Sequence, residues 1–282
     1  MNGKMFIVTH KKVAMPKIKD YEPILVGADI HPEIIEYQTV DNQGINISRK
    51  NPNYCELTGI YWLWKNAYFD IIGISHYRRY FTKSCISNSA RFYLTMEEAA
   101  FVLQNKRVIL PKVRYSPTSI ICAIKRAPNL DDVNEMYQAI VACFPQYIDD
   151  YMWYLRQNKE HLYNMFVMKW DDFCKYCDWL FTILDYIEER HDMDAEIDSY
   201  RLRLYGFLSE RLISVWVHHN INDSEIAHIS VINTEEGELN RFKHYLSNCW
   251  RNLLYYFNKL SKRNIDHEDE IIQKIIEKRV IL

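Results

Sequence analysis

The segment Asp70-Ile-Ile-Gly-Ile-Ser-His-Tyr-Arg-Arg-Tyr80 contains the pattern on which the predicted architecture rests. Its first six residues have the length and apolar character of a buried strand, and a polar cluster from His76 to Tyr80 follows immediately. Other apolar runs of strand length alternate with longer segments of helical period; they are Met5–His10, Pro23–Gly27, Arg107–Leu110, Asn164–Met168 and Ile226–Val231. This alternation predicts an α/β fold with a mostly parallel central sheet.

The segments between these strands have the spacing of helices with one buried face. Apolar residues recur every three or four positions in 51–68, in 171–187 and in 201–218, and Thr95-Met-Glu-Glu98 is a capping box. No internal repeat and no linker rich in proline, glycine or serine divides the chain. We therefore predict one domain over residues 1–237 and a helical C-terminal extension over residues 238–282.

Composition excludes several classes of protein. The formal net charge of the 282 residues is −2, which argues against a globally basic nucleic-acid binder. Only 7 glycines accompany 21 tyrosines, so a glycine-rich phosphate loop is not expected. The sequence has no apolar run of transmembrane length and no signal peptide, and its 7 cysteines are an odd number. These features predict a cytoplasmic protein with reduced thiols. Cys174 and Cys177 are interpreted as core thiols, because Cys177 fits an apolar helix stripe.

Polar residues follow two of the predicted strands directly. Thr9, His10 and Lys11 leave the first strand, and His76 to Tyr80 leave the strand that begins at Asp70. Ligands of open α/β sheets bind at the carboxyl ends of strands. Two adjacent guanidinium groups suit a diphosphate, because each presents a planar fork to the phosphate oxygens. In the alternative interpretation, one arginine pairs with a carboxylate such as Asp70 and closes a turn.

Two acidic motifs have both a functional and a structural interpretation. Glu210 is flanked by apolar residues on a predicted helix, where burial would give the raised pKa of a general base; alternatively it is an ordinary solvated residue. Asp192-Met-Asp194 matches the D-x-D pattern that holds Mn²⁺ or Mg²⁺ on a diphosphate, but it follows a predicted helix in a charged run. We expect a solvated loop there and assign no metal ligand. Loss of activity in EDTA, restored by Mn²⁺, would instead indicate a divalent metal.

The C-terminal extension contains a basic amphipathic segment. Residues 241–263 include six lysines and arginines, no acidic residue, and apolar side chains at helical spacing. Such a helix can lie in an anionic membrane interface as a peripheral contact. It can equally cover the sheet or join two copies of the chain into a homodimer, and periodicity alone leaves these alternatives open.

Seven segments together resemble the bacterial DUF4422 family, which is found among glycosyltransferases of capsular and exopolysaccharide biosynthesis. These segments are Phe6–Lys11, Asn46–Asn51, Tyr54–Thr58, Tyr61–Asn66, Gly73–Phe81, Asn164–Met168 and Gly206–Leu212. They occur in order between about residue 5 and residue 232, and the tail is not covered. The resemblance implies a GT-A-like α/β domain. It also implies transfer of a sugar, such as galactose in its furanose or pyranose form, from a UDP-sugar or similar donor to a lipid-linked or oligosaccharide acceptor at the inner face of the plasma membrane.

The resemblance and the strand-end pattern together suggest a role for each candidate residue. Arg78 and Arg79, with Lys11 nearby, would stabilise the charge that develops on the departing diphosphate. Glu210 would deprotonate the acceptor hydroxyl, with Glu56 as the second candidate. The residues assigned to donor binding are Thr9, His10, Lys11, His76, Tyr77 and Asn164. A non-catalytic nucleotide-sugar or glycan-binding protein of an assembly complex is the alternative function.

Overall fold

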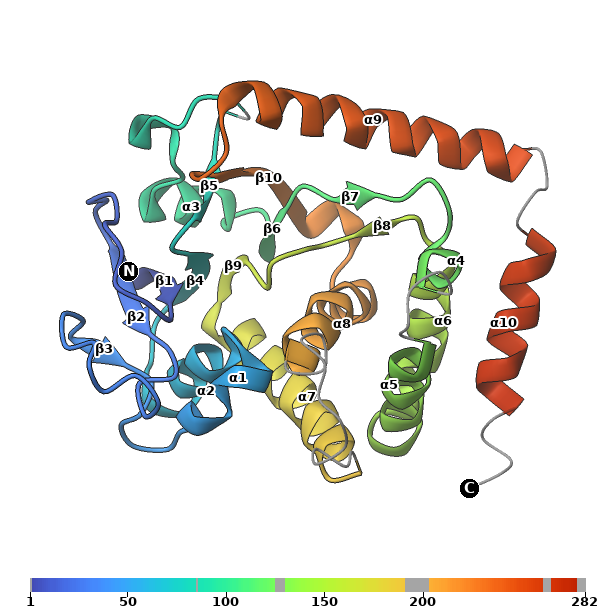
Figure 1. Cartoon of the computed structure of the whole chain (residues 1–282), viewed down its shortest axis with the longest axis horizontal. Helices are drawn as coiled ribbons and strands as arrows, with labels where there is room; N and C mark the ends of the chain where they lie inside the picture. The colour runs from blue at the N-terminus through green and yellow to red at the C-terminus, as the bar shows by residue number, and fades with distance from the viewer. Residues whose placement is uncertain (1, 85, 125–129, 191–202, 261–264, 278–282) are drawn as a thin grey trace.

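A computed structural model describes residues 2–84, 86–124, 130–190, 203–260 and 265–277. A sheet of eight strands crosses the centre of this described part (Figure 1). In spatial order its strands are β3 (Thr39–Val40), β2 (Tyr21–Leu25), β1 (Gly3–Thr9), β4 (Ile71–His76), β5 (Arg79–Thr82), β10 (Ile226–Asn233), β6 (Val108–Pro111) and β9 (Phe166–Lys169).

The sheet is mixed, so the prediction of a mostly parallel sheet is wrong. Strands β3, β2, β1 and β4 are parallel to one another, as is the pair β10 and β6. Strand β5 runs antiparallel to β4 and β10, and β9 runs antiparallel to β4 and β6. The sequence pattern missed this because the cluster from His76 to Tyr80 is a tight hairpin, in which His76 pairs with Arg79, and not a loop after a strand.

Helices cover both faces of the sheet. Alternate residues of β1 show the arrangement, since Phe6 and Val8 belong to the large core on one face and Met5 to a smaller core on the other. The smaller core is closed by α3 (Met96–Val102), whose capping box at Thr95 and Glu98 is present as predicted. The helices packed into the large core are α1 (Asn51–Tyr54), α2 (Leu57–Asn66), α4 (Ile120–Ile124), α5 (Leu130–Cys143), α6 (Ile148–Arg156), α7 (Trp170–Glu188) and α8 (Leu204–Asn220).

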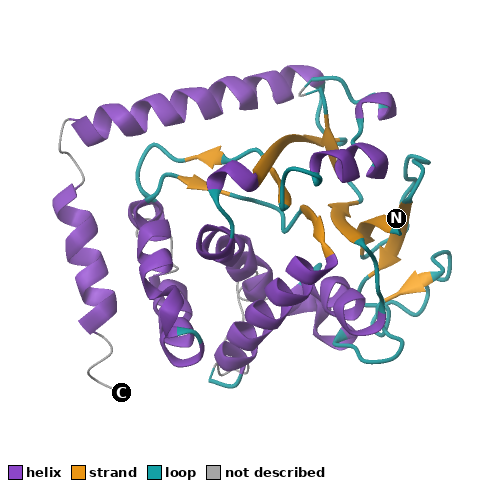
Figure 2. Ribbon diagram, turned by 180° about the vertical axis from the view of Figure 1, so that it is seen from behind, coloured by secondary structure: helices purple, strands orange, loops and turns teal. Residues whose placement is uncertain are grey.

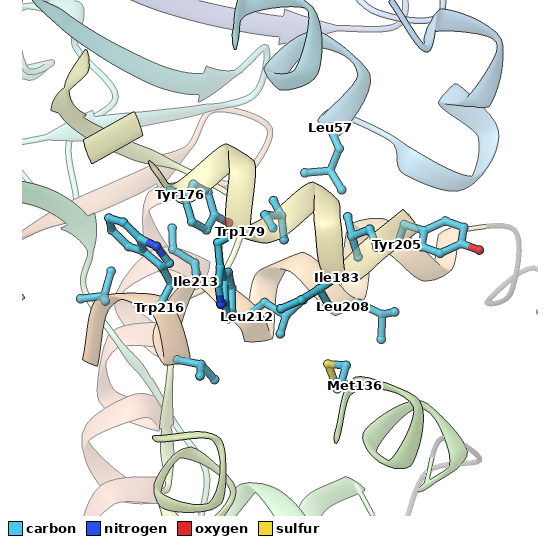
Figure 3. Packing of buried hydrophobic residues seen from close by; sticks show 14 of the residues in the cluster. Leu57, Met136, Tyr176, Trp179, Ile183, Tyr205, Leu208, Leu212, Ile213 and Trp216 are labelled. Carbon is cyan, nitrogen blue, oxygen red and sulfur yellow. The ribbon is translucent and has the colours of Figure 1, made fainter. Parts of the chain in front are cut away.

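Helices α7 and α8 form the centre of the large core. Trp179 and Ile183 of α7 lie against Leu208 and Leu212 of α8, with Met136 of α5 across from them (Figure 3). Helix α8 is apolar around most of its circumference, as expected of a helix surrounded by protein. A carboxylate on α8 therefore has an environment unlike that of a solvated helix face.

The helix predicted over 51–68 is two helices. Cys55 separates α1 from α2 in a left-handed backbone conformation with φ of 51°. The side chain of Asn51 stabilises this break, because its Nδ2 donates 2.7 Å to the carbonyl of Cys55 and 3.2 Å to Oγ1 of Thr58. The break turns the start of α2, including Glu56, toward the edge of the sheet described below.

The C-terminal extension is helical, as predicted, and consists of α9 (Glu238–Leu260) and α10 (Ile265–Glu277). Helix α9 runs along a two-stranded ribbon of β7 (Arg114–Tyr115) and β8 (Lys159–Glu160), and α10 turns back beside α4 and α5 (Figures 1 and 2). In the described ranges, every helix is too short or too polar to cross a bilayer.

Candidate active site

The first part of the site lies where β1 and β4 end. Because these strands are parallel neighbours, their carboxyl ends share one edge of the sheet. The N–H of Tyr77 donates 3.1 Å to the carbonyl of Val8, which holds the two ends together. His10 meets the Tyr77 ring edge-on at 5.7 Å between ring centres, and Nζ of Lys11 lies 4.8 Å from the centre of that ring.

Lys11, Arg78 and Arg203 give this edge its positive charge, and together with His10 we call them the cationic corner. Burial lowers the pKa of His10, and the charges of Lys11, Arg203 and Arg78 lower it further. Arg203 comes from the start of α8, where its Nε donates 3.4 Å to Sγ of Cys55. An anion placed here would relieve the repulsion among these groups.

The two adjacent arginines point to different places. Arg78 lies 3.3 Å from a carboxylate oxygen of Glu235, in a pair that is partly exposed. The guanidinium of Arg79 lies 4.3 Å from the centre of the Tyr163 ring. The two guanidinium groups therefore have different partners, and their binding of one diphosphate together stays a prediction. Arg78 fits the alternative interpretation, in which an arginine pairs with a carboxylate of the same chain. Its partner is Glu235 and not Asp70.

Thr9 is buried, and its hydroxyl donates 2.7 Å to the carbonyl of Lys11. This side chain shapes the turn after β1, which presents His10 and Lys11 outward.

The second part of the site is built around the left-handed residues Tyr163 and Asn164, with φ of 80° and 49°. The carbonyl of Tyr163 lies 2.6 Å from Nε2 of His76. Nδ2 of Asn164 donates 2.6 Å to Oε1 of Glu56 and 3.1 Å to the carbonyl of Gly206. Asn164 is buried, so it orients Glu56 and does not itself reach an open surface. An asparagine tolerates the left-handed conformation better than most residues, which suits this turn.

Glu210 completes this second part, which with Glu56, His76 and Asn164 we call the carboxylate cluster. Burial raises the pKa of Glu210 to about 7, the charge of Glu56 adds to the increase, and a hydrogen bond from the Tyr163 backbone opposes it. This confirms the raised pKa expected from the apolar sequence around Glu210. Burial also lowers the pKa of His76, so its imidazole is neutral near pH 7.

A glycine allows the two carboxylates to approach. Gly206 of α8 faces Cys55, and a Cβ at Gly206 would lie 3.3 Å from both Cβ and Sγ of that cysteine. The close contact brings α8 against the break between α1 and α2. As a result, Glu210 on α8 and Glu56 at the start of α2 occupy one site.

A cavity of about 1010 Å³ adjoins the carboxylate cluster. Its lining includes Arg79 and Tyr163 together with residues of β6, β7, β8, β10, α6, α8 and α9. One of the lining residues, Tyr163, is thus the residue whose backbone contacts both His76 and Glu210.

No group of three or more His, Cys, Asp or Glu side chains that could hold a metal ion occurs in the described part of the chain. The pattern Asp192-Met-Asp194 lies outside the described residues. Cys174 and Cys177 are unpaired thiols of α7, and Cys177 is fully buried, in agreement with their interpretation as core residues.

Residues 4–221 match the model of a protein family described as a domain of unknown function, DUF4422. The chain belongs to the DUF4422 family. The match ends before α9 and α10. No curated protein matches this DUF4422 chain in sequence.

Among solved structures, the DUF4422 chain is similar to the bifunctional glycosyltransferase WbbM in its apo form, with 24% identity and a TM-score of 0.75. The likeness covers 84% of this chain but 46% of WbbM, so the chain spans about half of that protein's length. It establishes a shared α/β fold. The mannosyltransferase Ktr4p of S. cerevisiae, solved with GDP, is also similar, with 10% identity over 79% of this chain and 83% of that one, but its TM-score of 0.26 is too low to compare sites.

Several residues of the site were not predicted from the sequence. Arg203 and Tyr163 are not part of any recognisable motif, and they reach the site through the fold of α8 and of the turn before β9. The lysines and arginines of the cavity come from β5, β7, β8 and α9 and from the segment between β6 and β7. Only the pair Tyr163-Asn164 carries a local signal, since an asparagine before a buried strand favours a left-handed turn.

Proposed function

We propose that this DUF4422 protein is a glycosyltransferase that uses a nucleotide diphosphate sugar, such as UDP-galactose, and a glycan acceptor of capsule, exopolysaccharide or O-antigen synthesis. The observation that carries the proposal is the position of Glu210, whose pKa is raised to about 7, beside the cationic corner. Sugar transfer needs a base for the acceptor and cations for the departing diphosphate. Family membership and the fold shared with WbbM support the same class of reaction.

In the proposed reaction, the acceptor hydroxyl oxygen forms a bond to the anomeric carbon of the sugar. The bond from that carbon to the diphosphate oxygen breaks, and its electron pair leaves with the nucleotide diphosphate. The hydroxyl proton passes to Glu210, which must be ionised to accept it. Lys11, Arg78 and Arg203 stabilise the negative charge on the leaving group, while Asn164 holds Glu56 and the Tyr163 backbone holds Glu210 and His76.

We also propose that α9 lies in the interface of an anionic membrane, where a lipid-linked acceptor is found. The side of α9 that faces the protein is polar, because Asn248, Tyr255 and Asn258 bond to backbone groups of other elements. Its outer side is apolar and exposed over the whole helix: Leu239, Phe242, Leu246, Trp250, Leu253, Tyr256, Phe257 and Leu260. The exposed basic side chain of Lys243 lies beside this apolar face and would complement anionic headgroups.

The proposed function is tested by thermal shift with UDP, GDP and dTDP, followed by release of nucleotide from the corresponding sugars. We expect a nucleoside diphosphate to stabilise the protein and Arg203→Gln or Lys11→Gln to weaken its binding by about tenfold, because hydrogen bonds to charged groups contribute about 1.5–3 kcal/mol. Lys19→Gln is the control, since Lys19 precedes β2 and lies at the opposite edge of the sheet. Binding without any turnover would indicate the non-catalytic alternative, and no binding would contradict both.

A further inference from the structure

The cavity under α9 has an excess of positive charge. Its lining includes six lysine and arginine side chains and four histidines but only two carboxylates, those of Asp223 and Glu236. Glu236 is already engaged, since it accepts 3.0 Å from Nδ2 of Asn233 and lies 3.1 Å from Nδ1 of His244. The cavity therefore has more cations than its own acidic residues neutralise.

Five of these residues form a cation cluster: Arg114 on β7, Lys159 on β8, His161, His228 on β10 and Arg251 on α9. The Nε of Arg251 is buried and has no hydrogen-bond acceptor. Burial lowers the pKa of Arg251, and the charge of Arg114 adds to the decrease, whereas Glu160 opposes it. A buried N–H without an acceptor destabilises the protein, and a bound anion would remove that cost.

The two histidines of the cation cluster add hydrogen-bonding groups. Their Nε2 atoms lie 3.1 Å apart, their rings are stacked, and Nδ1 of His161 lies 3.0 Å from Oγ of Ser214. Burial lowers the pKa of His161 to about 3, with contributions from His228 and Lys159. Burial and Lys159 also lower the pKa of His228, against the effect of Asp223. Both rings are thus neutral near pH 7. When Nε2 of His161 donates to Nε2 of His228, the N–H at Nδ1 of His228 is left to donate to a ligand.

We propose that the cation cluster binds a phosphate or diphosphate group carried by the acceptor. This inference rests on the proposed function and specifies the chemical class of its acceptor. Guanidinium groups on β7 and α9 offer planar forks to phosphate oxygens, and Lys159 offers a third positive charge. Tyr163 lines the cavity and its backbone bonds to Glu210, so a glycan attached to this phosphate could reach the base past Tyr163. Because α9 roofs the cavity and its outer face is apolar, the phosphate would be joined to a lipid.

The test measures binding of geranyl diphosphate, with geraniol as the uncharged control, to the full-length protein by calorimetry. We expect Arg251→Gln and Arg114→Gln each to weaken geranyl diphosphate binding by about tenfold or more and to leave UDP binding unchanged. Arg251→Lys keeps the positive charge, so it should bind more tightly than Arg251→Gln. If both variants lost binding equally, misfolding would explain the loss. Lys175→Gln, exposed on α7 and outside the cavity lining, should bind as the unaltered protein does.

Each alternative source of the anion gives a different result. If UDP displaces geranyl diphosphate and Arg203→Gln abolishes binding of both, the diphosphate occupies the donor site and the inference is overturned. If Arg251→Gln instead weakens binding only to phosphatidylglycerol vesicles, the cluster serves membrane headgroups, and the inference is again overturned. The protein could also bind geranyl diphosphate through Arg251 and yet transfer no sugar. That result would support the anion site and contradict the proposed function, so the two proposals can fail separately.

Discussion

Nδ2 of Asn164 donates a 2.6 Å hydrogen bond to Oε1 of Glu56, joining residues 108 positions apart in the chain. The same amide nitrogen donates to the carbonyl of Gly206, one turn before Glu210 on α8. One buried side chain thus connects the start of α2, the turn before β9 and the first turn of α8. The start of α2 carries Glu56, the turn before β9 carries Tyr163, which contacts His76, and α8 carries Glu210. The geometry of the carboxylate cluster therefore depends on Asn164.

Replacing Asn164 should reduce stability and activity together. Asn164→Ala removes both hydrogen bonds and places alanine at a φ of 49°, so we expect a loss of about 2–4 kcal/mol in the free energy of unfolding. Asn164→Gly also removes the hydrogen bonds but accepts the backbone conformation. Urea unfolding should therefore find the glycine variant more stable than the alanine variant by about 1 kcal/mol. Equal stabilities would mean that the left-handed backbone is not strained.

Glu210→Gln should reduce the turnover rate by about 10²–10⁴, because the amide cannot accept the acceptor proton. In the unaltered protein, the rate should rise with pH through about 7 as Glu210 ionises. Glu56→Gln should move this rise to lower pH, since it removes the like charge that helps to raise the pKa of Glu210. The exposed Glu97→Gln is the matched control. A pH profile unchanged in Glu56→Gln would contradict the coupling.

The raised pKa of Glu210 also affects stability. Between the ordinary carboxyl pKa of 4.5 and about 7, the folded protein holds a proton that the unfolded chain has lost. The contribution of Glu210 to stability is therefore complete below pH 4.5 and is lost as pH rises through 7. At pH 8, Glu210→Gln should consequently raise the melting temperature slightly, measured by calorimetry, even though it removes activity. A lower melting temperature would indicate that the ionised carboxylate is stabilised by its surroundings.

Away from the site, Arg107 and Asp172 form a two-pronged ion pair. Nη2 and Nε of Arg107 lie 2.6 Å and 3.2 Å from the two oxygens of Asp172, which is buried. Asp172→Asn should lower the free energy of unfolding by about 2–3 kcal/mol, since hydrogen bonds between charged groups of this kind contribute on that order. The exposed ion pair of Lys83 and Glu98 serves for comparison. Lys83→Gln should lower the free energy of unfolding by less than about 1 kcal/mol.

The outer face of α9 can be tested without disturbing the core. Trp250 and Phe257 are 61% and 62% exposed, so the double change to serine should alter the free energy of unfolding by less than about 1 kcal/mol. Co-sedimentation with phosphatidylglycerol vesicles should nevertheless decrease at least tenfold. Phe101→Ser, which replaces a 70% exposed residue on α3, should leave vesicle binding unchanged. If the double variant changes the oligomeric state and not vesicle binding, the face pairs two copies of the chain.

Much of the fold follows from local sequence patterns, and the exceptions have physical causes. The apolar runs located β1, β4, β6 and β9 because these strands are buried on both faces. The run of β10 was also located, although most of that strand is only half-buried. The direction of β5 and β9 could not be predicted, since strand periodicity is identical for parallel and antiparallel pairs. Helices α4 to α6 were not predicted at all, although they complete the large core.

The site was predictable where it lies at strand ends and not where distant elements meet. His10, Lys11, His76 and Tyr77 share an edge because β1 and β4 are adjacent and parallel. The separation of Arg78 from Arg79 arises from the hairpin, which turns successive side chains in different directions. The buried positions of Thr9 and Asn164 depend on hydrogen bonds that the sequence does not reveal.

The amide of Asn248 on α9 has a consequence for how the protein can be shortened. Its oxygen accepts from the N–H of Tyr115 and its nitrogen donates to the carbonyl of Val113, so it fills the place that a neighbouring strand would take beside β7. Although α9 lies beyond the family match, it is in this respect an integral part of the domain. Truncation after residue 237 would leave an open strand edge and unroof the basic cavity, and the shortened chain should tend to self-associate through that edge.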